Sequence, residues 1–172
     1  MEKKFELTDN FVINAFGIKM FQIKCTKSFK YANEGDLGGY VEKEDNLSQS
    51  GDAWVSGNAW VSGDAWVSGN AWVSGDARVY GDALVYGDAQ VYGDARVENN
   101  HMHCGFDCFG SCNRHTHAYK TKGNKVEITC GCFRGNIEEF ERKVEETHSG
   151  TIYEKQYKAI INLIKIKFGI DG

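Results

Sequence analysis

Residues Gly51 to Glu98 read GDAWVS GNAWVS GDAWVS GNAWVS GDARVY GDALVY GDAQVY GDARVE, which is eight nearly identical hexads without an insertion. Within each hexad the stretch Ala-x-Val-x alternates, so Ala and Val share one face of a short strand and the variable residues share the other. The Gly-Asp or Gly-Asn pair predicts a corner, because Gly accepts a positive φ and Asp or Asn tolerates unusual backbone angles. The repeat therefore predicts a parallel β-helix from about Val41 to Val97.

This alternation separates an inward set of side chains from an outward set. The inward alanine column runs from Ala53 to Ala95, and we expect Val41 and Leu47 to extend it towards the N-terminus. The Trp, Arg, Ser and Tyr residues of the repeat are expected to point outwards.

The period V-x-G-[DN]-A-x resembles the hexapeptide repeat of bacterial acyltransferases and γ-class carbonic anhydrases. The resemblance implies a left-handed, triangular β-helix with three hexads per coil, so that residues eighteen apart stack on one face. One alternative function that the resemblance implies is that of an acyltransferase-like enzyme. However, all five histidines lie after the repeat, and the hexads have no insertion to shape an acceptor pocket. A carbonic anhydrase would need three imidazoles around a metal at the coil surface.

The repeat divides the chain into three parts. Residues 1–40 are expected to form an N-terminal β cap, with short strands in residues 3–8, 11–14 and 17–29. Residues 41–98 form the coil. Residues 99–172 are expected to hold a Cys/His-rich loop, a β-hairpin and two helices. The fold class is therefore mainly β, a left-handed parallel β-helix of hexapeptide repeats with an N-terminal β cap and a C-terminal ββαα segment that packs on the coil.

The C-terminal elements are predicted from local signals. Gly123-Asn124 lies between two alternating runs and predicts the turn of the hairpin. Asn136 is a good N-cap for a helix that ends at about His148. A second helix is expected from about Tyr153 to Phe168, because its apolar residues recur at helical spacing.

The whole layout also resembles small proteins encoded by bacteriophages and prophages. The segments that carry the resemblance are GDLGGYVEKEDNLS before the hexads and CGCFRGNIEEFERKVEETH after them. It implies a viral or prophage origin and supplies no settled biochemical role.

Composition excludes several classes of function. The formal charge of -4 gives no basic surface for general nucleic-acid binding. No apolar run approaches the roughly 20 residues that span a bilayer, and the start MEKKFELTDNF lacks the apolar core of a signal peptide. We therefore expect a cytoplasmic protein, in the host cytoplasm if a phage encodes it, with reduced cysteines and no membrane partner.

A zinc site is a second alternative, because Cys and His are dense after the repeat. Thiolates and imidazoles are the ligands that Zn²⁺ prefers. The pattern lacks the paired C-x2-C spacing of zinc ribbons, and small buried thiols that fill a compact cap would give the same composition. No metal ligand is assigned and no cofactor is expected, with zinc kept possible. Cysteine catalysis, with His115 or His117 as the base, is a more remote hypothesis. The residues that could bind zinc are His101, His103, Cys104, Cys108, Cys112, His115, His117, Cys130 and Cys132.

The outward face of the coil carries the predicted binding site. Four tryptophans occupy successive outward positions, and contiguous exposed apolar surface usually marks an interaction site. With eighteen-residue stacking, Trp60, Arg78 and Arg96 share one face with Tyr80 beside them, a set that can stack a planar group and hold an anion. The predicted ligand- or partner-binding residues are Trp54, Trp60, Trp66, Trp72, Arg78, Tyr80 and Arg96.

The tryptophans could instead be buried in one of two ways. Hexapeptide coils often trimerise side by side, so the rings could be buried between subunits. They could also pack under the N-terminal cap or the C-terminal helices. The function expected from the sequence is that of a non-catalytic phage-type binding protein and homo-oligomer, a trimer on the resemblance. Its partner would be a small anionic, nucleotide-like ligand or a host protein, bound to counteract host defence.

Overall fold

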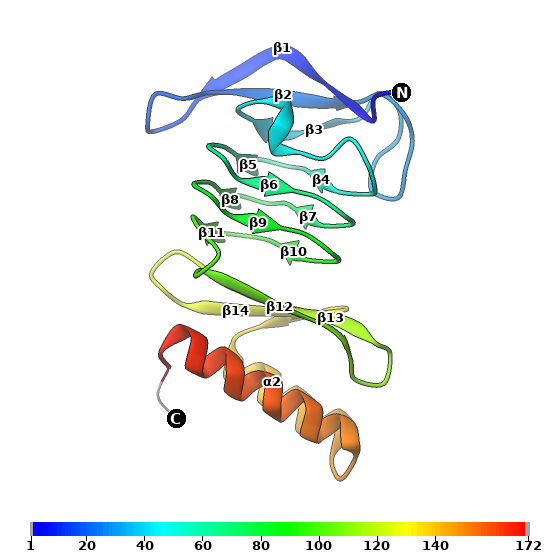
Figure 1. Cartoon of the computed structure of the whole chain (residues 1–172), viewed down its shortest axis with the longest axis vertical. Helices are drawn as coiled ribbons and strands as arrows, with labels where there is room; N and C mark the ends of the chain where they lie inside the picture. The colour runs from blue at the N-terminus through cyan, green and yellow to red at the C-terminus, as the bar shows by residue number, and fades with distance from the viewer. Residues whose placement is uncertain (1, 171–172) are drawn as a thin grey trace. The chain divides into compact units, whose positions relative to one another are not determined.

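The structure, a computed structural model, describes residues 2–170. These residues form two compact units, with the division after Asn100. The first unit contains the repeat, with two-residue strands stacked in successive turns, and the second unit contains a sheet and two helices (Figure 1).

The repeat forms the predicted coil, a β-solenoid of about three turns. Each hexad supplies one short strand, and residues eighteen apart pair in parallel, as in Trp60 with Arg78. The stacking predicted from the hexads is therefore confirmed. The strands are β4 (Trp54–Val55), β5 (Trp60–Val61), β6 (Trp66–Val67), β7 (Trp72–Val73), β8 (Arg78–Val79), β9 (Leu84–Val85), β10 (Gln90–Val91) and β11 (Arg96–Val97).

The interior of the coil consists of the Ala and Val columns. Every Ala and Val from Ala53 to Val97 is at most 2% exposed. The prediction for Val41 and Leu47 was wrong in one respect, because they pair with Val61 and Val67 and so continue the valine column. Their spacing to these partners is twenty residues, since the first turn is longer than the repeats that follow it.

The corners depend on glycine. The glycines of the repeat have φ between 59° and 71°, a region in which a Cβ atom is strained. At Gly69 an added Cβ would also lie 2.9 Å from the backbone nitrogen of Gly87 in the next turn. Beside the glycines, Asn70 donates its side-chain N–H to the carboxylate of Asp88 at 2.9 Å. In this column, Asn70 therefore places an amide where a carboxylate would stack between Asp52 and Asp88.

The N-terminal cap is one three-stranded antiparallel continuation of the coil. Strand β1 (Phe5–Ile13) joins the two short strands predicted for this region, with an irregularity between Leu7 and Phe11. Strand β2 (Lys19–Cys25) pairs with β1 and with β3 (Leu37–Val41), and β3 pairs in parallel with β5. In β3, Gly38 and Gly39 have no room for a Cβ, which would lie 2.5 to 2.7 Å from coil carbonyl oxygens.

Side chains of the cap bond to the backbone of the first turn, where strand edges would otherwise be unpaired. Lys4, only 6% exposed, donates to the carbonyls of Ala53 at 2.7 Å and Gly51 at 3.2 Å. Burial lowers the pKa of Lys4 to about 8. Asn46, which follows in the short 3-10 helix η1 (Glu44–Asn46), donates to the carbonyls of Gly63 and Ala65.

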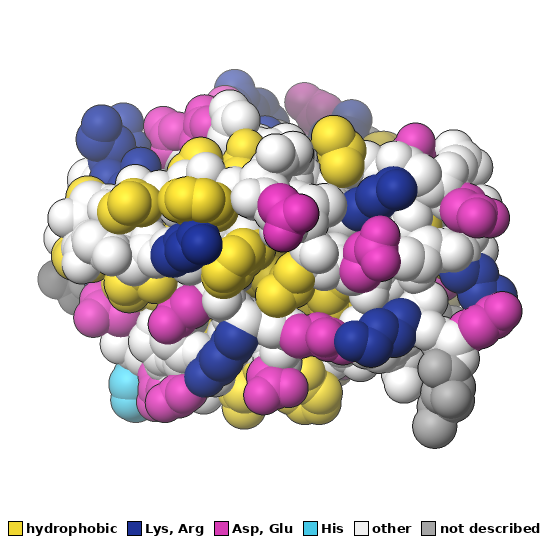
Figure 2. Space-filling view, turned by 90° about the horizontal axis from the view of Figure 1, so that it is seen from above, with side chains coloured by type: hydrophobic (Ala, Val, Ile, Leu, Met, Phe, Trp, Pro, Cys, Tyr) yellow, Lys and Arg dark blue, Asp and Glu magenta, His cyan; other side chains and the backbone are white. Residues whose placement is uncertain are grey.

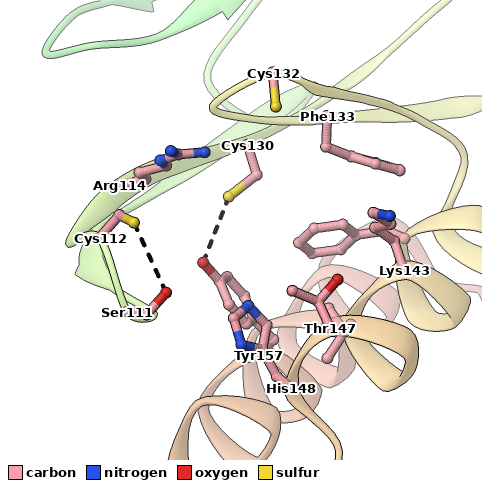
Figure 3. A pocket seen from close by; sticks show the side chains of 12 residues that line it. Ser111, Cys112, Arg114, Cys130, Cys132, Phe133, Lys143, Thr147, His148 and Tyr157 are labelled. Carbon is pink, nitrogen blue, oxygen red and sulfur yellow. Dashed lines mark hydrogen bonds between the residues drawn. The ribbon is translucent and has the colours of Figure 1, made fainter.

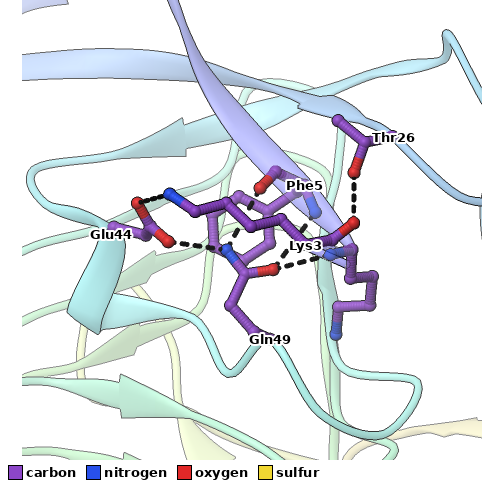
Figure 4. Close-up of polar contacts among 6 residues, drawn as sticks. Lys3, Phe5, Thr26, Glu44 and Gln49 are labelled. Atoms are coloured by element: carbon purple, nitrogen blue, oxygen red, sulfur yellow. Dashed lines mark hydrogen bonds and ion pairs between the residues drawn. The ribbon is translucent and has the colours of Figure 1, made fainter. Parts of the chain in front are cut away.

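Gln49 fixes the start of β1 (Figure 4). Its Oε1 accepts hydrogen bonds from the N–H groups of Lys4 and Phe5, and its Nε2 donates to the Phe5 carbonyl and to Glu44. Glu44 also pairs with Lys3 at 2.8 Å. The polar contacts thus anchor the cap to the segment that enters the coil.

The outer side of the cap is partly apolar. Figure 2 shows this end of the first unit, with hydrophobic side chains gathered among basic and acidic residues. The largest exposed apolar side chains of β1 and its turn are Phe11, Ile13 and Phe16, and Lys19 lies 3.9 Å from the ring of Phe11.

The second unit contains more strands than expected. The segment predicted as a Cys/His-rich loop forms β12 (His103–Phe109), which pairs with β13 (Arg114–Lys120). The sheet continues through β14 (Val126–Cys130) to β15 (Phe133–Gly135), so the segment is ββββαα and not ββαα. Strand β12 gave only a weak sequence signal, because it contains no β-branched residue and because Gly105 and Asp107 are residue types that strands disfavour.

The turn and the helices agree with their predictions. Asn124 has φ of 60° in the turn between β13 and β14. Helix α1 (Ile137–His148) begins at the Asn136 cap, whose side chain accepts the N–H of Glu139. Helix α2 (Ile152–Phe168) begins after Thr151. Both helices and one face of the sheet share a core centred on Phe140, Tyr157, Ile160, Ile161 and Ile164.

Candidate functional site

The coil presents three outward faces, each built from residues eighteen apart. We name them the covered face (Trp54, Trp72 and Gln90), the apolar face (Trp66 and Leu84) and the arginine face (Tyr40, Trp60, Arg78 and Arg96). The register of all three agrees with the stacking predicted from the repeat, except that Tyr40 was not foreseen.

The covered face lies under the chain's own loop between β2 and β3. Phe29 packs edge-on against Trp54 at 5.3 Å, and Tyr31 stacks on Trp72 at 5.4 Å with the rings 13° apart. Trp54 is only 2% exposed, and the indole N–H of Trp72 donates to Ser56. These two tryptophans therefore follow the alternative in which rings pack under the N-terminal cap, and Trp54 offers no surface to a partner.

The arginine face brings a cation and two aromatic rings together. The guanidinium of Arg78 lies 5.4 Å from the ring centre of Trp60, within the range of a cation–π contact. Tyr80 also packs against Trp60, with the ring centroids 5.8 Å apart. Arg96 is paired in register with Arg78 and is exposed. Four of the predicted residues thus lie side by side.

The cations of this face are two arginines, and Glu98 follows Arg96 at the next outward position. Within residues 2–170, neither Arg78 nor Arg96 forms an ion pair. Neighbouring strands in a sheet are spaced by roughly 4.8 Å, so the two arginine side chains leave the backbone at adjacent positions. The arrangement can stack a flat ring and accept a negatively charged group beside it.

The apolar face is the most exposed part of the tryptophan set. Trp66 is 46% exposed and its register neighbour Leu84 is 39% exposed. Tyr86, in the next column, is 59% exposed. This patch is better suited to packing against an apolar protein surface than to binding a polar ligand.

The Cys and His residues do not form a metal centre in the described chain. Among residues 2–170, no three His, Cys, Asp or Glu side chains converge as a ligand set. His103 and His117 contact each other at 3.0 Å, and burial lowers the pKa of His103 to about 4. His115 instead lies 2.5 Å from Asp107. Burial raises the pKa of the Cys104 thiol to about 11, which opposes a role as nucleophile.

Three of the six cysteines line a cavity of about 280 Å³ inside the second unit (Figure 3). They are Cys112, Cys130 and Cys132, and they face side chains of α1 and α2 across the cavity. From the sequence, these thiols were candidates as zinc ligands, as small buried residues that fill a compact cap and, more remotely, as catalytic cysteines. The other lining residues were missed, because a cavity arises from packing between segments and leaves no local pattern.

The comparisons with known proteins bear on the repeat. A family model described as the YdcK β-solenoid repeat matches residues 53–69, 77–90 and 89–102. The match supports the repeat architecture and covers a minor part of the chain. No curated protein matches the sequence. In residues 2–170, helices long and apolar enough to cross a membrane are absent.

Proposed function

We propose that the protein is a non-catalytic binding protein whose arginine face takes up a planar, anionic, nucleotide-like ligand. The observation that carries the proposal is the guanidinium of Arg78 over the ring of Trp60, without a carboxylate partner in residues 2–170. An arginine held on a ring keeps its N–H edge available, so it can donate to a phosphate while the aromatic side chains stack a base.

The rigid backbone of the coil supports this role. Trp60 and Arg78 belong to parallel neighbours β5 and β8, and the interior beneath them is filled by Ala and Val. The outward side chains are therefore presented from a surface that is ordered before the ligand binds, which lowers the entropic cost of binding.

The experiment is calorimetric titration of the full chain with adenosine monophosphate, guanosine monophosphate and cyclic di-adenosine monophosphate. We expect at least one to bind, and Arg78→Gln and Trp60→Ala each to weaken it about tenfold, because each removes a charge-assisted or stacking contact worth roughly 1 to 3 kcal/mol. Arg142→Gln on α1 is the matched control and should leave the affinity unchanged. Equal binding by all four proteins would exclude the arginine face as the site.

A second proposal concerns self-association, and it rests on the exposed apolar face. We expect copies of the chain to pack through Trp66, Leu84 and Tyr86, in the side-by-side trimer of left-handed coils that the resemblance to hexapeptide-repeat proteins implies. Light scattering after gel filtration tests this, with Trp66→Ser combined with Leu84→Ser expected to lower the mass towards a monomer. Ile166→Ser, at an exposed position of α2, is the control.

We propose a biological role from the resemblance of the layout to phage proteins. A phage protein that binds a nucleotide-like molecule could sequester a host signal, and one that binds through an apolar face could cover a host protein. The resemblance of the flanking segments to phage and prophage proteins is the support for a role against host defence.

A further inference from the structure

We propose that the cavity in the second unit is a binding site for a small carboxylate with an aromatic or alicyclic body. This site is separate from the arginine face, because all its lining residues lie between Ser111 and Tyr157. It combines an apolar floor with a cationic rim, and each part limits the chemistry of the ligand.

Aromatic rings form the floor of the cavity. Phe133 and Phe140 have centroids 4.9 Å apart, and Phe140 meets Tyr157 edge-on at 5.7 Å. His148 stacks on Tyr157 at 5.5 Å. Rings arranged in this way present apolar faces and edges to a flat hydrocarbon body.

The cavity also contains a phenol hydroxyl, which Tyr157 supplies. The hydroxyl of Tyr157 lies 3.7 Å from the Sγ of Cys130, and Thr116 donates its hydroxyl to the same sulfur at 3.3 Å. Burial raises the pKa of Tyr157, so the phenol keeps its proton at physiological pH. Tyr157 therefore adds no negative charge to the cavity that would repel an anion.

The rim is cationic. Figure 3 shows Arg114 and Lys143 on opposite sides of the cavity, from β13 and α1. Among the described lining residues there is no Asp or Glu, although the whole chain has a net charge of -4. Arg114 makes no ion pair within residues 2–170, and the ion pair of Lys143 is a long contact of 3.5 Å to exposed Glu146. An anionic group on the ligand would find a cation without a close ion-pair partner on either side of the cavity.

The volume restricts the size of the ligand. A cavity of about 280 Å³ is just below the range of roughly 300 to 1,000 Å³ typical of small-molecule sites. It suits a body of one or two fused rings with one carboxylate, and it is too small to enclose a dinucleotide.

The test uses naphthalene-2-carboxylate as probe and naphthalene-2-carboxamide, its uncharged isostere, as the matched control ligand. Binding to the full chain is measured by calorimetry. We expect the carboxylate to bind at least tenfold more tightly than the amide, and Arg114→Gln to remove most of that difference. Lys143→Gln should weaken the carboxylate to a smaller extent, which gives a second variant if the first folds poorly. Lys158→Gln, on the exposed side of α2, and Arg78→Gln should bind like wild type.

The exposed cysteines provide a second readout within one molecule. Cys112 and Cys132 line the cavity, whereas Cys108 is exposed and lies outside it. Bound naphthalene-2-carboxylate should slow alkylation of Cys112 and Cys132 by N-ethylmaleimide and leave Cys108 unaffected. The proposal is overturned if the three thiols react at unchanged rates, if the amide protects as well as the acid, or if Arg78→Gln weakens binding while Arg114→Gln does not.

Discussion

The coil and the C-terminal unit bury apolar residues in different ways. The coil fills its interior with one Ala and one Val per strand, and every such residue from Ala53 to Val97 is at most 2% exposed. The C-terminal unit packs large side chains such as Phe140 and Ile161 between a sheet and two helices, and it holds a cavity of about 280 Å³. The coil therefore has only outward side chains to offer a ligand, whereas the C-terminal unit has a cavity lined by side chains.

The largest expected effect is at the corners of the coil, where the next turn leaves no room for an added Cβ atom. Gly69→Ala places a Cβ in the positive-φ region and 2.9 Å from the nitrogen of Gly87. We expect a loss of about 3 to 5 kcal/mol in the free energy of unfolding, from backbone strain and overpacking together. Urea denaturation followed by circular dichroism measures the loss.

Gly87→Ala is the matched control for that variant. Gly87 has φ of 65°, but an added Cβ would meet nothing within 4 Å. It should lose only about 1 to 2 kcal/mol, the strain of the backbone alone. Equal losses in the free energy of unfolding for the two variants would mean that contact with the next turn adds nothing to the backbone strain at the corner.

The second prediction concerns the buried amine that joins the cap to the coil. The pKa of Lys4 is lowered by burial from 10.5 to about 8. Between these pH values the unfolded chain retains a proton that the folded chain has lost, so the free energy of unfolding rises with pH. Below about pH 8 both states are protonated and this contribution is constant.

Lys4→Met should therefore reduce the rise in stability between pH 8 and 10.5 by about 1 to 3 kcal/mol. Urea denaturation at several pH values measures it. Lys27→Met, at an exposed lysine, is the control and should keep the wild-type slope. If Lys4→Met keeps that slope as well, burial does not lower the pKa of this amine.

A smaller effect is expected in the C-terminal unit, where local capping matters more than stacking. Asn136→Ala removes the side-chain acceptor of the Glu139 N–H and leaves only the reciprocal bond of the capping box, which the backbone N–H of residue 136 donates to the Glu139 carboxylate. We expect a loss of about 1 kcal/mol and faster hydrogen exchange in the first turn of α1. Ser149→Ala, at the other end of α1, should leave this exchange unchanged. The same exchange rates in both variants would contradict a stabilising cap.

The smallest effect is expected in the Asn and Asp columns of the coil. Asn70→Asp replaces an amide that donates to Asp88 by a third carboxylate in a column with Asp52. The expected loss is about 0.5 kcal/mol at low salt and less at high salt, because ions screen exposed charges. Asn10→Asp on β1 is the control in thermal denaturation at both salt concentrations. A loss that does not depend on salt would point to the lost hydrogen bond alone.

The two units also differ in how well the sequence predicted them. The strands of the coil follow from the period of six, and their register follows from contacts at a fixed spacing of eighteen residues. Each hexad therefore predicts its own strand and its pairing partner. Helices α1 and α2 were predicted within a residue or two for the same reason, because their caps and apolar spacing are local.

The sequence was least informative where segments without a shared period meet. Phe29 and Tyr31 cover Trp54 and Trp72, and nothing in the loop indicates which coil face it lies on. The cavity likewise depends on the approach of Arg114, Lys143 and Tyr157 from different elements. Such contacts are set by tertiary packing and not by pattern.

The central claim is that the arginine face binds a planar anion, and the four indole N–H signals in a nitrogen-correlated NMR spectrum test it most directly. Addition of the nucleotide that binds in calorimetry should shift the signal of Trp60 and leave that of Trp54, which lies buried under Phe29, unchanged. Arg78→Gln should reduce the shift at the same nucleotide concentration. An unchanged Trp60 signal at saturating nucleotide would contradict the claim.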